Sequence, residues 1–206
     1  MPADLKPVRI ADDVFEFRVE TSRHAQALAN ELRSAAIAED VVAGLDRVAI
    51  RFAPDRAKQI EAWLLEIQSI QVAEKTDLPI IKIPVQYGGE FGPDLTFICE
   101  AMDLSEQAFI ELHTETEHLV EMIGFTPGFS YISGLPDAFK IPRLGTPRSR
   151  VPAGSIGISA AFTGIYALAG PGGWPLIGRT QDTLFDPNAL EPFRIHPGQR
   201  VKFRAV

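Results

Sequence analysis

The feature that most constrains the fold is a run of 28 residues, 151–178, that carries no charged side chain. A helix that crosses a membrane needs roughly 20 predominantly apolar residues, so the length alone would allow one. Seven glycines and three prolines interrupt the run, and a plain helix does not tolerate so many. The segment therefore predicts tightly turned, buried β structure.

The chain around this run changes character along its length. Twelve of the 16 glycines and ten of the 16 prolines fall from Gly124 onward. Short apolar runs broken by these residues are typical of a β-rich barrel or sandwich. One amphipathic helix is expected near residues 105–113. We place the domain boundary near Tyr87, with one domain at 1–86 and a second at 87–206.

The first domain alternates strand and helix signals. A strand at 14–19 repeats with a period of two, and a helix that Ser22 can cap carries Leu28 and Leu32 on one stripe. A hairpin follows at 41–52. A second helix from Pro54 places on one apolar face Ile60, Trp63, Leu64 and Ile67. With a last strand at 79–85, the order β-α-β-β-α-β predicts a ferredoxin-like α/β domain.

Charge and cysteine content limit the functional classes. The net charge of −7 does not favour binding to nucleic acid or to an anionic membrane. The single cysteine, Cys99, cannot form an internal disulfide, and the first residues show no signal-peptide pattern. We therefore expect a cytoplasmic protein. Cys99 alternates with apolar neighbours like an inert residue of a strand core.

The second domain contains one basic segment. Between Asp137 and Asp182 there are no acidic residues, and the segment's charge of +5 leaves −12 for the rest of the chain. Its cations are Lys140, Arg143, Arg148, Arg150 and Arg179. Arginine suits bidentate recognition of carboxylate or phosphate. Two interpretations stay open at this point: an anion-binding face, or arginines that pair structurally with acids from elsewhere.

Two other motifs resemble functional sites, but their sequence context does not support a function. Residues 173–180 resemble a phosphate-binding loop with arginine in place of lysine, but glycines and prolines surround them where a strand and a helix should flank such a loop. His113 and His118 are five apart, so they do not share a helical face as metal ligands would. We expect no metal site, and we expect His113 at a helix end, where its cation would suit the helix dipole. A catalytic role for His113 is the less favoured alternative.

Several ordered segments resemble one protein family. They are GPDL (92–95), GFTPGFSY (124–131), PRSRVPAGS (147–155), TGIY (163–166), GPGGW (170–174), IGRT (177–180) and FDP (185–187). Together they resemble the family that unites allophanate hydrolase subunit 1, the kinase A inhibitor and the B-type subunit of 5-oxoprolinase, a carboxyltransferase domain with subdomains C and D. The resemblance runs from about Tyr87 to Val206, and the first domain fits the family's small α/β domain.

The resemblance implies an α+β chain with a cyclophilin-like β-barrel as its second domain. It implies a heteromer with an A-type carboxyltransferase-like partner, and a third, lactam-utilisation-type subunit. The implied activity is an ATP-dependent hydrolase that opens 5-oxoproline to glutamate, with this chain as a non-autonomous subunit. One branch of the family instead inhibits a sensor histidine kinase, and related domains serve in a biotin-dependent urea carboxylase. ATP is thus the expected cofactor, and the sequence does not say which subunit binds it.

Six residues are the predicted substrate- or anion-binding site: Arg148, Arg150, Arg179, Tyr166, Gly172 and Gly173. The glycines would let the backbone approach a ligand closely, and Tyr166 would line the pocket. The chain departs from the family pattern at Phe162, where a glutamine is usual, and at Ala167, where a proline is usual. A glutamine amide can hydrogen-bond a substrate, whereas the phenyl ring of Phe162 cannot.

Overall fold

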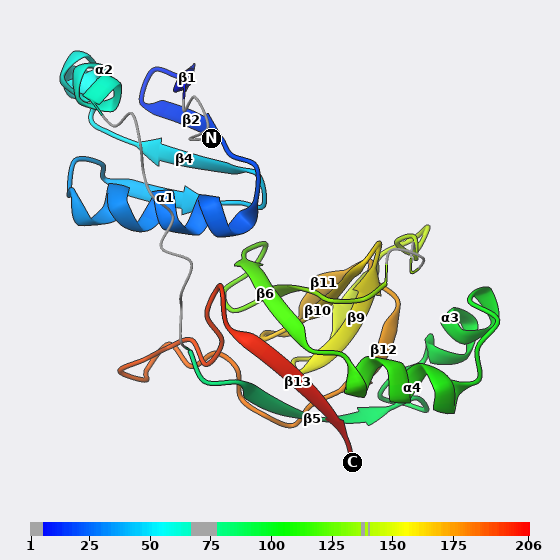
Figure 1. Ribbon diagram of the computed structural model, residues 1–206. Helices are drawn as coiled ribbons and strands as arrows, with labels where there is room; N and C mark the ends of the chain where they lie inside the picture. Colours follow the sequence, from blue (N-terminus) through cyan, green and yellow to red (C-terminus); the bar gives the residue numbers. More distant parts are fainter. Residues whose placement is uncertain (1–5, 67–77, 137–138, 140) are drawn as a thin grey trace. The chain divides into compact units, whose positions relative to one another are not determined.

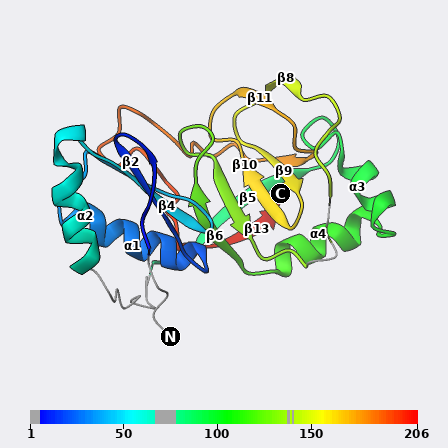
Figure 2. The same cartoon turned by 90° about the horizontal axis from the view of Figure 1, so that it is seen from above.

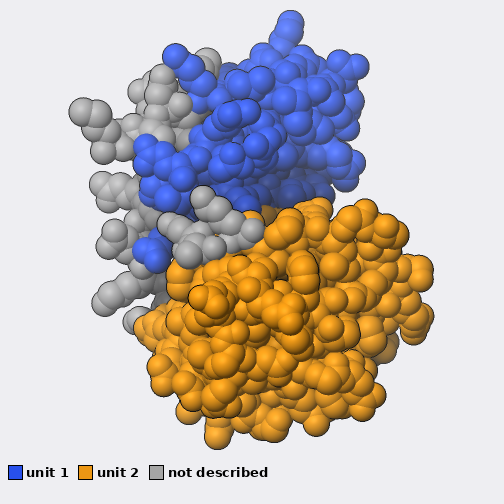
Figure 3. All heavy atoms as spheres, turned by 90° about the vertical axis from the view of Figure 1, so that its right-hand side faces the viewer, with its two compact units in different colours: residues 1–76 blue, residues 77–206 orange. Residues whose placement is uncertain are grey.

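The computed structural model describes residues 6–66, 78–136, 139 and 141–206. Two compact units make up the chain, residues 1–76 and residues 77–206 (Figure 3). The first combines a sheet with helices and the second is built around a closed barrel, so the expected α+β class is confirmed. Ile67 and Lys140 from the sequence predictions, and the side chain of Leu64, lie outside the described residues.

The first unit contains one four-stranded antiparallel sheet in the order β1-β2-β4-β3. Its elements are β1 (Val8–Ala11), β2 (Val14–Arg18), α1 (Ser22–Ser34), β3 (Asp40–Ala43), β4 (Arg47–Arg51), the single turn η1 (Pro54–Arg56) and α2 (Ala57–Glu66). The period-two pattern buries Phe15 and Phe17, which pack with Leu28 and Leu32 of α1 in one core. The expected helices and hairpin are therefore present.

Two details of the first unit differ from the sequence prediction. Thr21, not Ser22, caps α1: its side chain accepts a hydrogen bond from the backbone N–H of His24 at 3.2 Å. The fourth strand of the sheet is β1, which pairs beside β2, whereas the sequence predicts the segment at 79–85 in this sheet. All four residues of β1 are exposed, so no alternation of apolar and polar residues marks it in the sequence.

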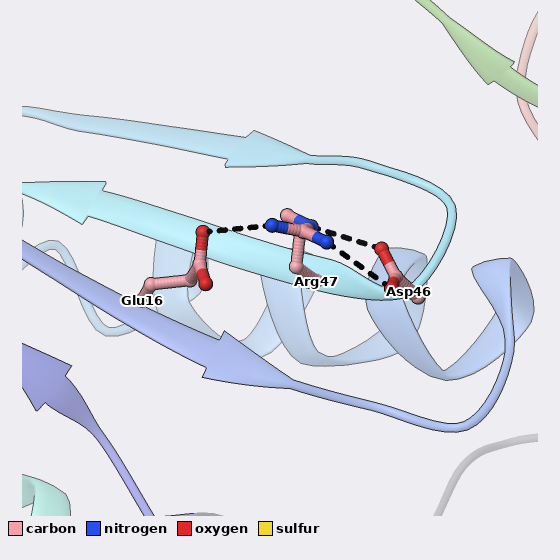
Figure 4. Close-up of polar contacts among 3 residues, drawn as sticks. All are labelled: Glu16, Asp46 and Arg47. Carbon is pink, nitrogen blue, oxygen red and sulfur yellow. Dashed lines mark hydrogen bonds and ion pairs between the residues drawn. The ribbon is translucent and has the colours of Figure 1, made fainter.

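An exposed charge group lies on the outer side of this sheet. Arg47 on β4 contacts Asp46 at 2.9 Å and Glu16 on β2 at 3.5 Å (Figure 4). These contacts join β4 to its neighbour β2. Solvent screens such exposed pairs, so they contribute little to the stability of the unit.

The second unit is a closed barrel of seven strands in the order β10-β7-β6-β13-β5-β12-β9 (Figure 1). The strands are β5 (Ile81–Tyr87), β6 (His118–Ile123), β7 (Ser130–Ser133), β9 (Ser155–Ser159), β10 (Phe162–Ile165), β12 (Leu176–Arg179) and β13 (Arg200–Ala205). Only the pair of β13 and β5 is parallel among the described barrel pairs. Three additions surround the barrel: α3 (Leu95–Ala101), α4 (Glu106–Glu115), and a small sheet of β8 (Arg148–Val151) and β11 (Gly170–Gly172) (Figure 2).

The predicted domain boundary near Tyr87 is wrong. The compact units divide between residues 76 and 77, and β5 belongs to the barrel, between β13 and β12. The alternation along this strand does predict burial correctly, because Ile83 and Val85 are both fully buried. The core that they fill is the barrel's own, which a pattern of alternation cannot reveal. The domains 1–86 and 87–206 are therefore corrected to 1–76 and 77–206.

The charge-free segment contributes a buried wall of the barrel. Ile156 and Ile158 belong to the main barrel core, and every residue of β9 is buried. Gly157 and Gly164 pair across β9 and β10. A Cβ on Gly164 would come within 2.7 Å of the rings of Phe129 and Trp174, so this glycine leaves the room that the aromatic side chains occupy. The prediction of buried β structure is confirmed.

Candidate functional site

An ion pair between Arg148 and Asp94 joins the small β8–β11 sheet to the barrel. Asp94 lies directly before α3, and its Oδ1 accepts a hydrogen bond from Nη2 of Arg148 at 2.8 Å. Its Oδ2 accepts a second bond from the backbone N–H of Leu176 on β12 at 2.6 Å. The Asp94 side chain is 15% exposed and that of Arg148 is 29% exposed. Both carboxylate oxygens are thus committed, and the carboxylate cannot turn without breaking one bond.

Gly92 allows Asp94 to lie this close to β12. A Cβ on Gly92 would come within 2.1 Å of the carbonyl oxygen of Ile177. The backbone N–H of Asp94 donates to the carbonyl of Leu176 at 3.0 Å, which fixes the same approach from the other side. Only glycine fits such contact. The GPDL segment is therefore the piece of sequence that sets the ion pair in place.

Only one of the two terminal nitrogens of the Arg148 guanidinium, Nη2, bonds to Asp94. Its Nη1 is buried and, among the described residues, has no hydrogen-bond partner. A buried donor without a partner is costly, and a charged one more so. An ordered water or an anionic ligand at Nη1 would remove this cost. The Arg148–Asp94 pair therefore leaves one shielded donor, Nη1, without a partner in the described part of the chain, while the Arg148 side chain as a whole is 29% exposed.

A bulge aims Arg148 inward. Gly170 pairs with Val151 and Gly172 pairs with Arg148, so β8 advances three residues while β11 advances two. The extra residue places Arg148 and the fully buried Val151 on the same side of the small sheet. A Cβ on Gly172 would come within 2.5 Å of Oη of Tyr166. The phenol of Tyr166 therefore lies against the strand that pairs with Arg148.

Opposing effects act on the Tyr166 phenol. Burial raises its pKa above the ordinary value, and the neighbouring phenol of Tyr131 acts in the same direction. A hydrogen bond with the backbone of Trp174 and the charges of Arg143 and Arg148 act against this rise. Because the pKa remains raised, the phenol is neutral near pH 7 and keeps its proton. The charges of two arginines and the phenol of Tyr131 thus act on Tyr166.

An aromatic cluster forms the floor of this region. Phe129 lies at its centre, edge-to-face with Tyr131 at 4.9 Å, with Tyr166 at 4.9 Å and with Trp174 at 5.5 Å. Phe162 packs against the cluster and is partly buried, as is Tyr131. Phe129, Tyr166 and Trp174 are buried. Tyr131 and Phe162 thus offer a partly exposed apolar surface, and Tyr166 of the same cluster lies against the strand that pairs with Arg148. This combination suits a small molecule with a carboxylate and an apolar body.

The structure brings together only part of the predicted site. Arg148, Tyr166 and Gly172 lie together, and Gly173 follows directly, its carbonyl accepting a bond from the N–H of Leu144 at 2.7 Å. Arg179 donates through Nε to the backbone carbonyl of Ala153 at 3.0 Å. Arg150 is exposed.

Three residues of the region are not among the six predicted ones: Asp94, Arg143 and Tyr131. Asp94 stands in the GPDL segment, which is one of the segments that carry the family resemblance. No spacing rule links it to Arg148, because the two residues are 54 positions apart.

The two histidines form a buried network within the barrel. Nδ1 of His113 lies 2.6 Å from the hydroxyl of Tyr87, and Nε2 lies 3.0 Å from that of Thr163. Burial, and then the neighbouring His118, lower the pKa of His113 well below its ordinary value. The expected cationic role of His113 is therefore wrong, although it does lie in the last turn of α4. A fully buried neutral imidazole cannot neutralise the helix dipole.

His118 lies against the same network. Its Nε2 is 2.9 Å from the carbonyl of His113, and its Nδ1 is 3.2 Å from the carbonyl of Ser133. Burial lowers its pKa, while these two backbone hydrogen bonds act against that fall. Within the described part of the chain, no group of three or more potential metal ligands is assembled.

Cys99 lies in α3 rather than in a strand, which corrects the sequence prediction. It is buried, and desolvation raises the pKa of its thiol. A protonated, buried thiol is a poor nucleophile.

The segment 173–180, which resembles a phosphate-binding loop, contains strand β12 and no helix start. This agrees with the conclusion from the sequence that it is not such a loop. No helix among the described residues is long and apolar enough to cross a membrane.

Solved structures share this architecture. The urea carboxylase of Kluyveromyces lactis matches 98% of this chain with 22% of its own length, at a TM-score of 0.74 and 18% identity. The protein TTHA0988 matches 94% of this chain with 40% of its own, at a TM-score of 0.81 and 32% identity. PH0987 of Pyrococcus horikoshii matches 98% of this chain with 97% of its own, at a TM-score of 0.61 and 32% identity. The fold is thus that of a carboxyltransferase-type module.

Sequence comparisons define the family. The model of the carboxyltransferase domain, subdomain C and D, matches residues 9–195, and the chain belongs to this family. Proteins named as the B-type subunit of 5-oxoprolinase are similar: that of Haemophilus influenzae is 38% identical over 192 residues, 90% of this chain and 87% of its own length. That of Escherichia coli O157:H7 is 43% identical over 149 residues, 72% of this chain, and the match spans only 66% of that relative's length.

Proposed function

We propose that this chain is the B-type subunit of an ATP-dependent 5-oxoprolinase, which opens 5-oxoproline to glutamate. The observation that carries the proposal is the 38% identity to the B-type 5-oxoprolinase subunit of Haemophilus influenzae, over 90% of this chain. The site described above supports the same conclusion. 5-Oxoproline is a five-membered lactam with one carboxylate, and a half-used arginine beside a partly exposed aromatic wall suits both parts.

The reaction needs activation of a resistant bond. A lactam carbonyl reacts slowly with water, and transfer of the γ-phosphoryl group of ATP to its oxygen makes the carbon a better electrophile. Water then adds to this carbon, the ring C–N bond breaks, and the nitrogen takes up a proton to become the amine of glutamate, which leaves an acyl phosphate at the side-chain carboxyl group. A second water hydrolyses the acyl phosphate and releases inorganic phosphate. Arginines at the site would stabilise the negative charge that develops on oxygen.

We propose further that the chain works only with partners, an A-type carboxyltransferase-like subunit and a third, lactam-utilisation-type subunit. His113 and Thr163 form a histidine–hydroxyl pair, but both side chains are fully buried. A substrate cannot reach them, so they do not act as base and nucleophile. The groups that bind and position ATP would then come at least partly from another subunit.

The apolar composition of the uncharged segment suggests a contact with such a partner, but its strand β9 is fully buried in the barrel and is not available for one. Leu168 of the same segment is exposed and is available. Exposed apolar side chains of the second unit are better candidates, among them Leu190 at 98% exposure and Phe125 at 63%. Apolar residues at the centre of a contact are typical of stable interfaces.

A stable hetero-oligomer with the A-type partner is the expected result of co-expression. Size-exclusion chromatography at micromolar concentration should show one peak that contains both chains. The variants Leu190→Ser and Phe125→Ser serve as probes of the surface, and Val42→Ser in the first unit, where Val42 is 58% exposed, serves as the matched control. Separate elution of the two wild-type proteins would contradict the proposed assembly.

A further inference from the structure

Resting on the proposed function for the identity of the substrate, we infer that Arg148 is the anchor for the substrate's carboxylate, held in position by Asp94. The matching class of ligand is a small ring that carries a single carboxylate. Tyr131 and Phe162 would form the wall against which the ring packs.

The hydrogen bonds of the Arg148 guanidinium leave one donor available for a ligand. Arginine offers its donors in a fixed planar fork that matches a carboxylate. Asp94 takes one arm of the fork through Nη2 and is itself pinned by the N–H of Leu176. The other terminal nitrogen, Nη1, is left without a partner among the described residues. Asp94 therefore orients Arg148 without using up the donor that a ligand needs.

The local charge also favours an anionic ligand. Asp94 compensates the charge of Arg148 through their ion pair. The segment between Asp137 and Asp182 contains no acidic residue, so its other cations have no acid within the segment to pair with. A ligand that carries a carboxylate would add a second negative group beside this basic segment.

Aromatic side chains lie in the region of the Arg148 guanidinium. The phenol of Tyr166 lies beside Gly172, on the strand paired with Arg148. Tyr131 and Phe162 are the partly exposed members of the aromatic cluster, with ring centroids 6.5 Å apart and nearly perpendicular. An apolar ring would pack on these faces while its carboxylate binds the guanidinium of Arg148.

Binding measurements on the complex with the A-type subunit test the inference. Three ligands are compared by isothermal titration: 5-oxoproline, 2-pyrrolidinone (the same lactam without the carboxylate) and cyclopentanecarboxylate (a ring carboxylate without the lactam). The wild-type protein should bind both carboxylates and should bind 2-pyrrolidinone much more weakly. Arg148→Met should lower the affinity for the two carboxylates by roughly 10- to 100-fold, the worth of a charge-assisted hydrogen bond, and should leave 2-pyrrolidinone unchanged.

Arg150→Met is the matched control, because Arg150 stands on the same strand and is exposed. It should leave all three affinities unchanged. Asp94→Ala should lose the preference for carboxylates. Asp94→Asn keeps only one acceptor oxygen, so it can accept from Arg148 or from the N–H of Leu176 but not from both, and it should restore the preference only in part. Thermal melting of each variant establishes that it is folded. Arg148→Lys, which keeps the charge but loses the fork, gives a second variant should Arg148→Met unfold.

The outcomes separate this inference from the proposed function. If 5-oxoproline binds equally to the wild type and to folded Arg148 variants, or if no ring carboxylate binds at all, the anchor is refuted. An equal loss of affinity for 2-pyrrolidinone would also refute it, because the effect would then be structural. If the wild type binds cyclopentanecarboxylate through Arg148 but the complex never turns over 5-oxoproline, the anchor stands and the proposed substrate is wrong.

Discussion

Replacing Gly154 by alanine should destabilise the barrel by about 2–5 kcal/mol, as left-handed strain and steric overlap add. Gly154 has a φ of +80°, and a Cβ there would come within 2.1 Å of the carbonyl oxygen of Thr180. Its own backbone bonds tie it to Tyr166 and Thr180, at 2.7 and 2.9 Å. The clash is with backbone, so no movement of a side chain can relieve it.

Fluorescence can isolate this effect in the barrel. The chain has two tryptophans, Trp63 in α2 of the first unit and Trp174 in the second. A Trp63→Phe background therefore reports unfolding of the barrel alone in a urea titration. Gly145→Ala is the control, because nothing lies within 4 Å of a Cβ at that position and it has no positive φ. Equal stability of the Gly154→Ala and Gly145→Ala proteins would show that the close approach at Gly154 is not present in solution.

Acidification from pH 7.5 to 5.5 should lower the free energy of unfolding of the barrel by about 2 kcal/mol through its two buried histidines. Burial lowers the pKa of His113 well below 6.5, and that of His118 in the same direction. The unfolded chain binds protons as the pH falls through 6.5, while the native state does not, so stability is lost on the acid side. A fully suppressed histidine contributes about 1.4 kcal/mol over this interval.

The variant His113→Gln tests how much of this pH dependence of stability comes from His113. It should be less stable than the wild type at pH 7.5, because it disturbs the bonds to Tyr87 and Thr163. Its stability should nevertheless fall by roughly 1.4 kcal/mol less than that of the wild type between the two pH values. His196→Gln, at an exposed position, is the matched control and should keep the full dependence. The same urea midpoint for the wild type at pH 7.5 and 5.5 would contradict the neutral, buried state of His113.

Local patterns in the sequence predict the local structure well. The stripes of α1 and the alternation in β2 and β4 point to burial that the structure shows, since side-chain period follows directly from backbone geometry. The charge-free segment is buried β structure as its composition indicates, and Gly164 within it makes room for Phe129 and Trp174. Ser105, at the start of the expected helix, does cap α4.

What the sequence could not show depends on contacts between distant segments. The strand at β5 alternates equally well for either unit, and only its pairing with β13, more than 100 residues later, assigns it to the barrel. The Arg148–Asp94 pair likewise arises from closure of the barrel around β12. The basic segment narrows the anion site to a few arginines, but charge alone cannot distinguish Arg148, whose Nη1 has no partner among the described residues, from Arg179, which is bonded to backbone.

Formation of glutamate from 5-oxoproline is the decisive measurement for the proposed function. This chain, its A-type partner and the third subunit would be combined with ATP, and glutamate and ADP would be measured together. We expect equal amounts of both products from the full mixture, and none from this chain alone or from the mixture that lacks it. Glutamate formation that does not depend on this chain, or turnover by this chain alone, would contradict its assignment as a non-autonomous subunit of the enzyme.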